Sequence, residues 1–252
     1  MGFLFSFACT AQAGTIIVSG DSNIVNDLDK KPGNARFFSN ILGSGTSVAV
    51  LDTTPGACCI GTFDDIINAH YNSLPGVTST KITGPVSAAG LAGVNVFIAL
   101  APNLAFTGAE TIALNNFLIG GGTIFALGDN TTFFPENTNV NNLLIALGSG
   151  LRIDPTNIDG DFTFANILAD PLTTGINVFE FASASRVTGG TTLFQTMTGS
   201  QTFIAYETST AQVPEPGAWL LTACGLLALG LHRSPKLLLR SVHQRQPQQD
   251  HR

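Results

Sequence analysis

The sequence contains few cysteines and little charge. Four cysteines occur in 252 residues, and two of them, Cys58 and Cys59, are adjacent. A disulfide between neighbouring residues closes a strained small ring, so we expect either such a vicinal disulfide or two free thiols. This cysteine content excludes the disulfide scaffold of small secreted domains. No second group of ligands accompanies the pair in the sequence, which argues against a zinc site.

Basic residues and large aromatic residues are also scarce. The chain carries 11 Lys and Arg against 17 Asp and Glu, and its formal net charge is −6. The basic residues between residues 14 and 212 are scattered, so the basic stripe that a nucleic-acid partner needs is missing. The chain has one Trp and two Tyr. A polysaccharide-binding module therefore stays an alternative that lacks most of the usual aromatic platforms.

An uncharged apolar run, residues 217–231, lies near the C-terminus. It is shorter than the roughly 20 residues that span a bilayer, but Arg233 can extend it by snorkelling. Trp219 suits the outer interface, and the basic residues that follow favour a cytoplasmic C-terminus. The sequence thus predicts a single C-terminal transmembrane helix, with a buried core helix as the alternative.

Two prolines precede the apolar run. Pro214 and Pro216 have a fixed φ and no N–H donor, so they hold Glu215 in an extended segment with Val213. The order of Pro-Glu-Pro motif, short apolar helix and basic residues resembles the PEP-CTERM sorting signal. The resemblance implies an exosortase partner that cuts near the motif in a Gram-negative, exopolysaccharide-making bacterium. Such signals usually end after the basic cluster, whereas here a polar tail continues over residues 234–252.

The N-terminus resembles a secretory signal peptide that lacks its front part. Residues 2–9 are apolar, and Ala11 and Ala13 form an A-x-A cleavage site. A misassigned start codon would explain the absence of a basic residue before the apolar stretch. The alternative is a buried first strand that continues into residues 15–18.

These signals divide the chain into four parts. They are a signal peptide (1–13), an exported α/β domain (14–212), the sorting signal with its transmembrane helix (213–233) and a basic, polar cytoplasmic tail (234–252). The sequence therefore predicts a membrane-anchored precursor that reaches the cell surface or the exopolysaccharide matrix.

Strand and helix patterns alternate in the first part of the domain. Short apolar runs indicate buried strands, and helical spacing closed by glycine indicates helices. The predicted strands are 15–19, 47–51, 94–100 and 123–127, and the predicted helices are 35–42, 63–71, 107–118 and 139–147. Beyond Gly150 the sequence predicts short strands at 178–182, 191–196 and 202–206. This alternation predicts a mostly parallel sheet with helices on both faces and a β-rich C-terminal part.

A second resemblance lies in residues 106–129. Phe106 to Glu110 lead into an apolar helix, and a glycine run at 120–122, a strand and a sharp turn at 128–129 follow. This order is similar to class I glutamine-amidotransferase-like domains, and residues 170–175 resemble a stretch of their non-catalytic members. The resemblance implies a flavodoxin-like fold over residues 15–207.

The residues needed for amidotransferase chemistry are not in their usual order. Catalytic relatives carry a cysteine on the sharp turn and a histidine later in the chain. Here the turn offers Asp129, and the one histidine of the domain, His70, comes upstream. Cys58 or Cys59 with His70 is the available nucleophile–base pair, and the alternative is a solvent-facing His70. We therefore expect no enzymatic activity and no cofactor, with a metal-dependent or amidotransferase-like extracellular hydrolase as the alternative.

Three aspartates follow predicted strands. Asp21, Asp52 and Asp129 each come after a buried run, and ligands of open α/β folds bind at the carboxyl ends of strands. The sequence predicts that these residues form a rim for a cation or a polar ligand. As an alternative, they cap helices and stabilise Asx-turns.

Overall fold

The computed structural model describes residues 13–52, 62–158, 160 and 163–209. The chain divides into two compact units, Met1–Ala211 and Gln212–Arg252, and all described residues belong to the first. The sorting-signal residues Val213–Pro216, the anchor flanks Trp219 and Arg233, and both Cys58 and Cys59 lie outside the described residues. Within the described ranges, no helix has the length and apolar character needed to cross a bilayer.

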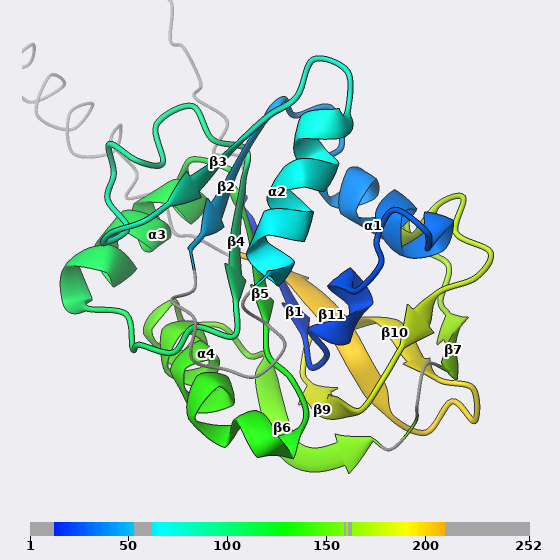
Figure 1. Ribbon diagram of the computed structural model, residues 1–252. Coiled ribbons are helices and arrows are strands. Elements are labelled where there is room, and N and C mark those ends of the chain that lie inside the picture. The colour runs from blue at the N-terminus through cyan, green and yellow to red at the C-terminus, as the bar shows by residue number, and fades with distance from the viewer. Residues whose placement is uncertain (1–12, 53–61, 159, 161–162, 210–252) are drawn as a thin grey trace, which may run out of the picture. The chain divides into compact units, whose positions relative to one another are not determined.

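A nine-stranded sheet lies at the centre of the domain, in the order β3-β2-β4-β5-β1-β11-β10-β7-β8 (Figure 1). Five strands form its parallel half: β1 (Thr15–Ser19), β2 (Ser47–Leu51), β3 (Thr78–Ile82), β4 (Val96–Leu100) and β5 (Thr123–Leu127). Apart from the edge strand β3, these are mainly apolar runs, as is typical of strands that are buried on both faces.

The other half of the sheet is antiparallel. It contains β7 (Thr163–Ile167), β8 (Glu180–Phe181), β10 (Thr191–Thr196) and β11 (Thr202–Thr208). A separate two-stranded sheet pairs β6 (Arg152–Ile158) with β9 (Ala184–Thr188). The short 3-10 helices are η1 (Asn23–Val25), η2 (Thr131–Phe133) and η3 (Pro171–Thr173). The sheet is therefore mixed, and antiparallel pairing begins where β11 joins β1.

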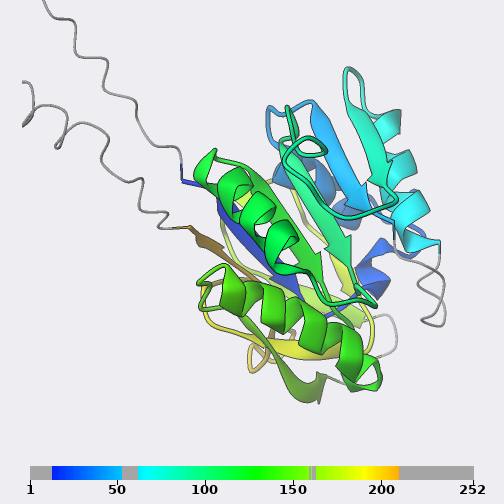
Figure 2. The ribbon, with the colours of Figure 1, turned by 90° about the vertical axis from the view of Figure 1, so that its left-hand side faces the viewer.

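Helices cover both faces of the sheet (Figure 2). The helices α1 (Pro32–Leu42) and α2 (Phe63–Ser73) pack on one face, in a core with alternate strand residues such as Ile17 and Phe125. The helices α3 (Gly108–Ile119) and α4 (Phe134–Ala146) pack on the other face, against residues such as Val18 and Ala126. Because successive strand residues point to opposite faces, each inner strand contributes to both cores.

The α/β class, the parallel sheet region and the helices on both faces are confirmed. The predicted strands at 15–19, 47–51 and 123–127 have the observed bounds, and Thr107 and Glu110 form the expected capping box at the start of α3. Four strands were not predicted, namely β3, β6, β7 and β9. These strands are as long as the predicted ones, but polar residues interrupt their sequences, so they lack the continuous apolar run of a buried strand.

A cluster of phenylalanine rings fills the core beneath α1. Phe37 is fully buried, and its ring makes edge-to-face contacts with the rings of Phe38, Phe125, Phe179 and Phe194, at centroid distances between 4.9 and 6.3 Å. These partners come from the same helix, from β5, from the segment before β8 and from β10. The ring of Phe37 therefore links the parallel and antiparallel halves of the sheet.

We expect Phe37→Ala to destabilise the domain by about 3–5 kcal/mol, since the change leaves a cavity between four aromatic neighbours. Phe134→Ala is the matched control, because this ring is 61% exposed and its loss should change stability by less than about 1 kcal/mol. Urea unfolding of both variants measures the difference. Equal destabilisation by the two changes would contradict the central role of Phe37.

Candidate functional site

At two places in the sheet, the connections that follow two neighbouring parallel strands run to opposite faces. The chain leaves β1 towards α1 on one face, whereas it leaves the adjacent strand β5 towards α4 on the other face. The same divergence occurs between β2, which leads to α2, and its neighbour β4, which leads to α3. Open α/β sheets bind ligands at such switch points, outside the carboxyl ends of the strands. These two places are therefore the first candidates for a site.

At the β1–β5 switch point, two aspartates are buried close to each other. Asp21 and Asp129 are 0% and 2% exposed. Asp21 accepts hydrogen bonds from the backbone N–H groups of Asn23 (2.7 Å) and Ala182 (2.8 Å). Asp129 accepts a hydrogen bond from the hydroxyl of Ser22. The two carboxyl groups thus tie the end of β1 to β5 and to the segment after β8.

Burial raises the pKa of both aspartates. The pKa of Asp21 rises to about 7, mainly because the carboxylate is desolvated and secondly because Asp129 repels its charge. Desolvation also raises the pKa of Asp129 to about 6, against the effect of its hydrogen bonds to Ser22 and Asn130. The pair therefore holds protons at a pH where exposed aspartates are ionised.

The space at this switch point is filled by closely approaching backbone segments and by the side chain of Asn137. A Cβ atom on Gly20 would lie 2.0 Å from the carbonyl oxygen of Ser185, and one on Gly128 would lie 2.2 Å from Oδ1 of Asn137. The Asn137 side chain accepts from the N–H of Asp129 (2.9 Å) and donates to its carbonyl oxygen (2.7 Å). Since all these groups are buried, the arrangement stabilises the fold and leaves little room for a ligand.

Asp52 lies at the other switch point, in an ion-pair cluster around Lys81 of β3. The ammonium of Lys81 is 3.0 Å from Asp52, 2.8 Å from Asp64 and 2.8 Å from Asp65. Hydrogen bonds to Asp64, Asp65 and Asp52 raise the pKa of Lys81, and the bond from Lys81 lowers the pKa of Asp52. Burial raises the pKa of Asp64. The cluster holds the start of α2 against β2 and β3.

A pocket of about 320 Å³ opens beside Asp52, at the carboxyl ends of β2, β3 and β4. Its walls include Pro85, Pro102, Leu104 and Phe106. The neighbouring Ala101, at the end of β4, has a φ of +36°, which is unusual for a residue with a Cβ atom. Strained residues of this kind cluster at ligand sites. This pocket is therefore the open candidate site at the carboxyl edge of the parallel strands.

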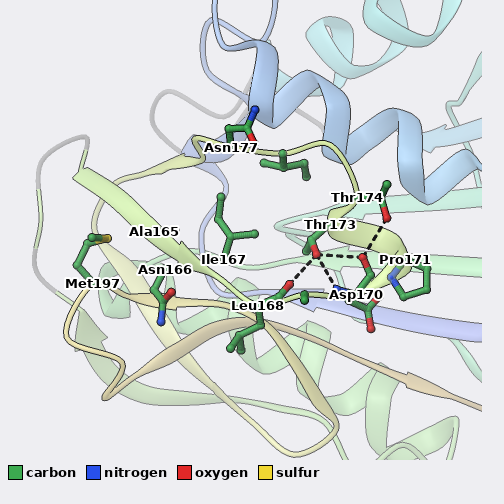
Figure 3. Close-up of a pocket in the computed structure, with 12 residues that line it drawn as sticks. Ala165, Asn166, Ile167, Leu168, Asp170, Pro171, Thr173, Thr174, Asn177 and Met197 are labelled. Atoms are coloured by element: carbon green, nitrogen blue, oxygen red, sulfur yellow. Dashed lines mark hydrogen bonds between the residues drawn. The ribbon is translucent and has the colours of Figure 1, made fainter.

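A larger and more open hollow, of about 790 Å³, lies beside β7 (Figure 3). Asp170 and Thr173 form a reciprocal capping box at η3 within its wall. The second carboxylate oxygen of Asp170 accepts a 2.9 Å hydrogen bond from the hydroxyl of Tyr206. The stretch 170–175 thus uses these polar groups to shape a turn.

His70 is half-buried on α2 rather than facing solvent. Its ring lies 6.2 Å from the ring of Phe38 and 5.4 Å from that of Tyr71, between centroids. Desolvation lowers its pKa. Its Nε2 atom has no hydrogen-bond partner among the described residues. The lowered pKa favours the neutral imidazole, which packs in the α1–α2 layer. The cysteines expected as its partners lie outside the described residues.

The structure separates the three aspartates of the predicted rim. Asp21 and Asp129 interact, whereas Asp52 follows β2, which is two strands from β5 in the sheet. With about 4.8 Å between strands, this separation is roughly 10 Å. In the described ranges, no group of three or more His, Cys, Asp or Glu side chains is arranged to hold a metal ion. Lys81, Ser22 and Glu110 are site residues that the sequence did not single out as such. The polar run of residues 78–81 was the available signal for Lys81.

Comparisons with known proteins identify no family. No protein-family model and no curated protein matches the chain. Among solved structures, the chain is similar to one described as "mmIFT52 N-terminal domain", with 16% sequence identity and a TM-score of 0.40. The match covers 47% of this chain and 63% of that chain, so it extends over less than two thirds of the other protein. A similarity at this level supports no argument about function.

We expect Asp129→Asn to flatten the pH dependence of stability. Both aspartates have folded pKa values above their unfolded values, so the folded state binds more protons and stability falls as the pH rises from about 4 to about 7. One pKa unit corresponds to about 1.4 kcal/mol, and the variant should reduce the loss between pH 4 and pH 8 by roughly 2 kcal/mol. Urea unfolding at several pH values measures this slope.

Asp29→Asn is the control for the loss of one carboxylate, because Asp29 is exposed and lies outside the buried pair. His70 acts in the opposite sense, since its lowered pKa makes stability fall as the pH drops below about 6.5. This contribution is common to both variants and cancels in the comparison. An unchanged slope in Asp129→Asn would show that the buried pair does not take up the protons.

Proposed function

We propose that the chain is an exported protein that an exosortase sorts at Val213–Pro216 to the cell surface or exopolysaccharide matrix of a Gram-negative bacterium. Its α/β domain has a non-catalytic role in binding or structure. The observation that carries this proposal is the order of Pro214, Glu215 and Pro216 directly before the uncharged run 217–231 and the basic residues after it. The resemblance to PEP-CTERM signals supplies the partner and the location.

The ends of the described domain are compatible with an anchored precursor. Thr15 at the start of β1 pairs with Thr208 at the end of β11, and the N–H of Ser209 donates to the carbonyl oxygen of Gly14 at 2.7 Å. The chain therefore enters and leaves the domain at the amino edge of the parallel strands. The pocket beside Asp52 opens at the carboxyl edge, at the other end of the same strands.

Two features of the described residues favour a non-catalytic domain. The hydroxyl of Ser22 is buried and bonded to a carboxyl group, and His70 packs against Phe38 in a different part of the core. A hydrolase that uses the aspartate rim would need its three carboxylates together, but Asp52 follows β2, two strands away from the strand that precedes Asp129. We therefore favour binding over the alternative of an extracellular hydrolase.

The fold that we propose is a rearranged flavodoxin-like sheet. The flavodoxin order is 2-1-3-4-5. When β2 is counted as the first strand, the order β3-β2-β4-β5 corresponds to 2-1-3-4. The strand β1 then occupies the position of the fifth strand. The amidotransferase-like resemblance of residues 106–129 belongs to this proposal, because it predicts the same arrangement around α3 and β5.

Processing at the sorting motif gives the direct test. We expect Glu215→Ala to leave the full-length chain in the membrane fraction, since the carboxylate is the polar group held between the two prolines. Expression in a bacterium that has an exosortase, followed by fractionation and intact mass measurement, separates the trimmed form from the precursor.

Gln212→Ala is the control, because this residue stands just before the motif and leaves Val213–Pro216 unchanged. It should be trimmed and released like the wild type. If Glu215→Ala gives the same surface species as the wild type, the sorting proposal is wrong, whatever the domain binds.

A further inference from the structure

We propose that the pocket beside Asp52 binds a small ligand that carries a primary ammonium group on a compact body. The inference rests on the proposed binding role of the domain and not on its sorting. The pocket has about 320 Å³ of space, which lies within the range of roughly 300–1,000 Å³ of small-molecule sites. It lies at the β2–β4 switch point, where an open α/β sheet is expected to hold a ligand.

The walls of the pocket are mainly apolar. Pro85 follows β3, and Pro102, Leu104 and Phe106 lie in the connection from β4 to α3. Leu104 is 74% exposed, more than any other large hydrophobic residue in the described ranges. An apolar surface of this kind covers the body of a small ligand, whereas an anionic ligand such as a nucleotide would find no basic group among the described residues of the pocket wall.

The charge around the pocket determines the polar part of the ligand. Asp52 lines the pocket and pairs with Lys81, which also pairs with the exposed Asp65 and with Asp64, whose pKa is raised by burial. The single ammonium of Lys81 therefore does not neutralise both Asp52 and Asp65. Glu110 adds a further carboxylate to the wall. A concave site with apolar walls and excess negative charge attracts cations and disfavours anions.

The two lining carboxylates differ in their freedom to meet a ligand. Glu110 accepts hydrogen bonds at both oxygens, from the N–H of Val86 (3.0 Å) and from the N–H of Thr107 (2.8 Å). Asp52 interacts with the side chains of Lys81 and Asp64, which lower its pKa and keep it ionised, but its own side chain is still 33% exposed. Asp52 is therefore the group that would contact the ammonium, while Glu110 contributes charge and holds the shape of the wall.

The other hollow lacks this combination. In the hollow beside β7, the carboxylate of Asp170 is bonded to Tyr206 and to the N–H of Leu172. No other charged residue lines it within the described ranges. The polar groups there serve the turn at η3, so the ligand inference applies to the pocket at the carboxyl edge.

The experiment uses the purified full-length chain in a mild nonionic detergent. Cyclohexylamine and glucosamine are the ammonium probes, one with an apolar body and one with a hydroxylated body, and cyclohexanol and glucose are their neutral counterparts. Ligand-observed NMR titration measures the dissociation constants. We expect at least one amine to bind at least roughly tenfold more tightly than its neutral counterpart, with weaker binding at high salt.

Two variants with one exposed hydrophobic residue changed to arginine locate the site. Leu104→Arg puts a positive charge on the pocket wall and should weaken amine binding at least roughly tenfold. Ile112→Arg is the matched control, because Ile112 is 64% exposed on α3 and does not line the pocket. Asp52→Asn should also weaken binding, and its far-UV circular dichroism checks that the fold is kept.

Each outcome bears on the proposal. Amine binding that Leu104→Arg and Asp52→Asn weaken and Ile112→Arg leaves unchanged supports it, and the preferred amine shows whether the body is apolar or sugar-like. Equal binding of amines and neutral compounds overturns the ammonium specificity. Binding that none of the variants changes, or no binding of any probe, overturns the site. None of these results depends on trimming at Glu215, so the ligand proposal and the sorting proposal can fail separately.

Discussion

The double pairing of β1 is the constraint on which the rest of the domain depends. This strand pairs in parallel with β5 through Ser19 and Leu127, and antiparallel with β11 through Thr15 and Thr208. Its residues from Ile16 to Ser19 are almost fully buried. Because β1 is covered on both faces and bonded on both edges, it joins the parallel half, with its crossover helices, to the antiparallel half that the end of the chain supplies.

The central position of β1 places several buried polar groups together at the switch point between β1 and β5. The chain must turn out of β1 and β5 in opposite directions, and the free N–H groups of these turns need acceptors inside the protein. Asp21 and Asp129 provide them, at the cost of a raised pKa for both carboxyl groups. The close approach of Gly20 to Ser185 shows how little space is left there. The switch point between β1 and β5 therefore serves stability.

The switch point between β2 and β4 differs from the first, because its carboxylates are arranged around the ammonium group of Lys81. Lys81 bridges the end of β2, the start of α2 and β3, and its neighbours keep a net negative charge beside an apolar pocket. The carboxyl edge of the parallel strands thus carries two different places: the closed switch point with the buried Asp21 and Asp129, and the open, acidic pocket beside Asp52. The two ends of the described domain lie together at the opposite edge.

Part of this organisation follows from local sequence. The apolar runs of β1, β2 and β5 are long enough and regular enough to indicate buried strands, and the Thr107–Glu110 capping box marks the start of α3. Such signals act over a few residues, so they can be recognised without knowing the fold. The four unpredicted strands contain more polar residues, and their pairing depends on partners far away in the chain.

The sequence by itself determined the α/β class, the helices of both faces and the candidate aspartates at the ends of strands. Only the tertiary structure decided which of these aspartates meet. The strand order brings β1 next to β5 and places two strands between the Asp52 and Asp21 strands, and this order results from long-range pairing that no local pattern records. The same order selected Lys81 as the partner of Asp52, since the two residues become neighbours only when β3 adds to the edge of β2.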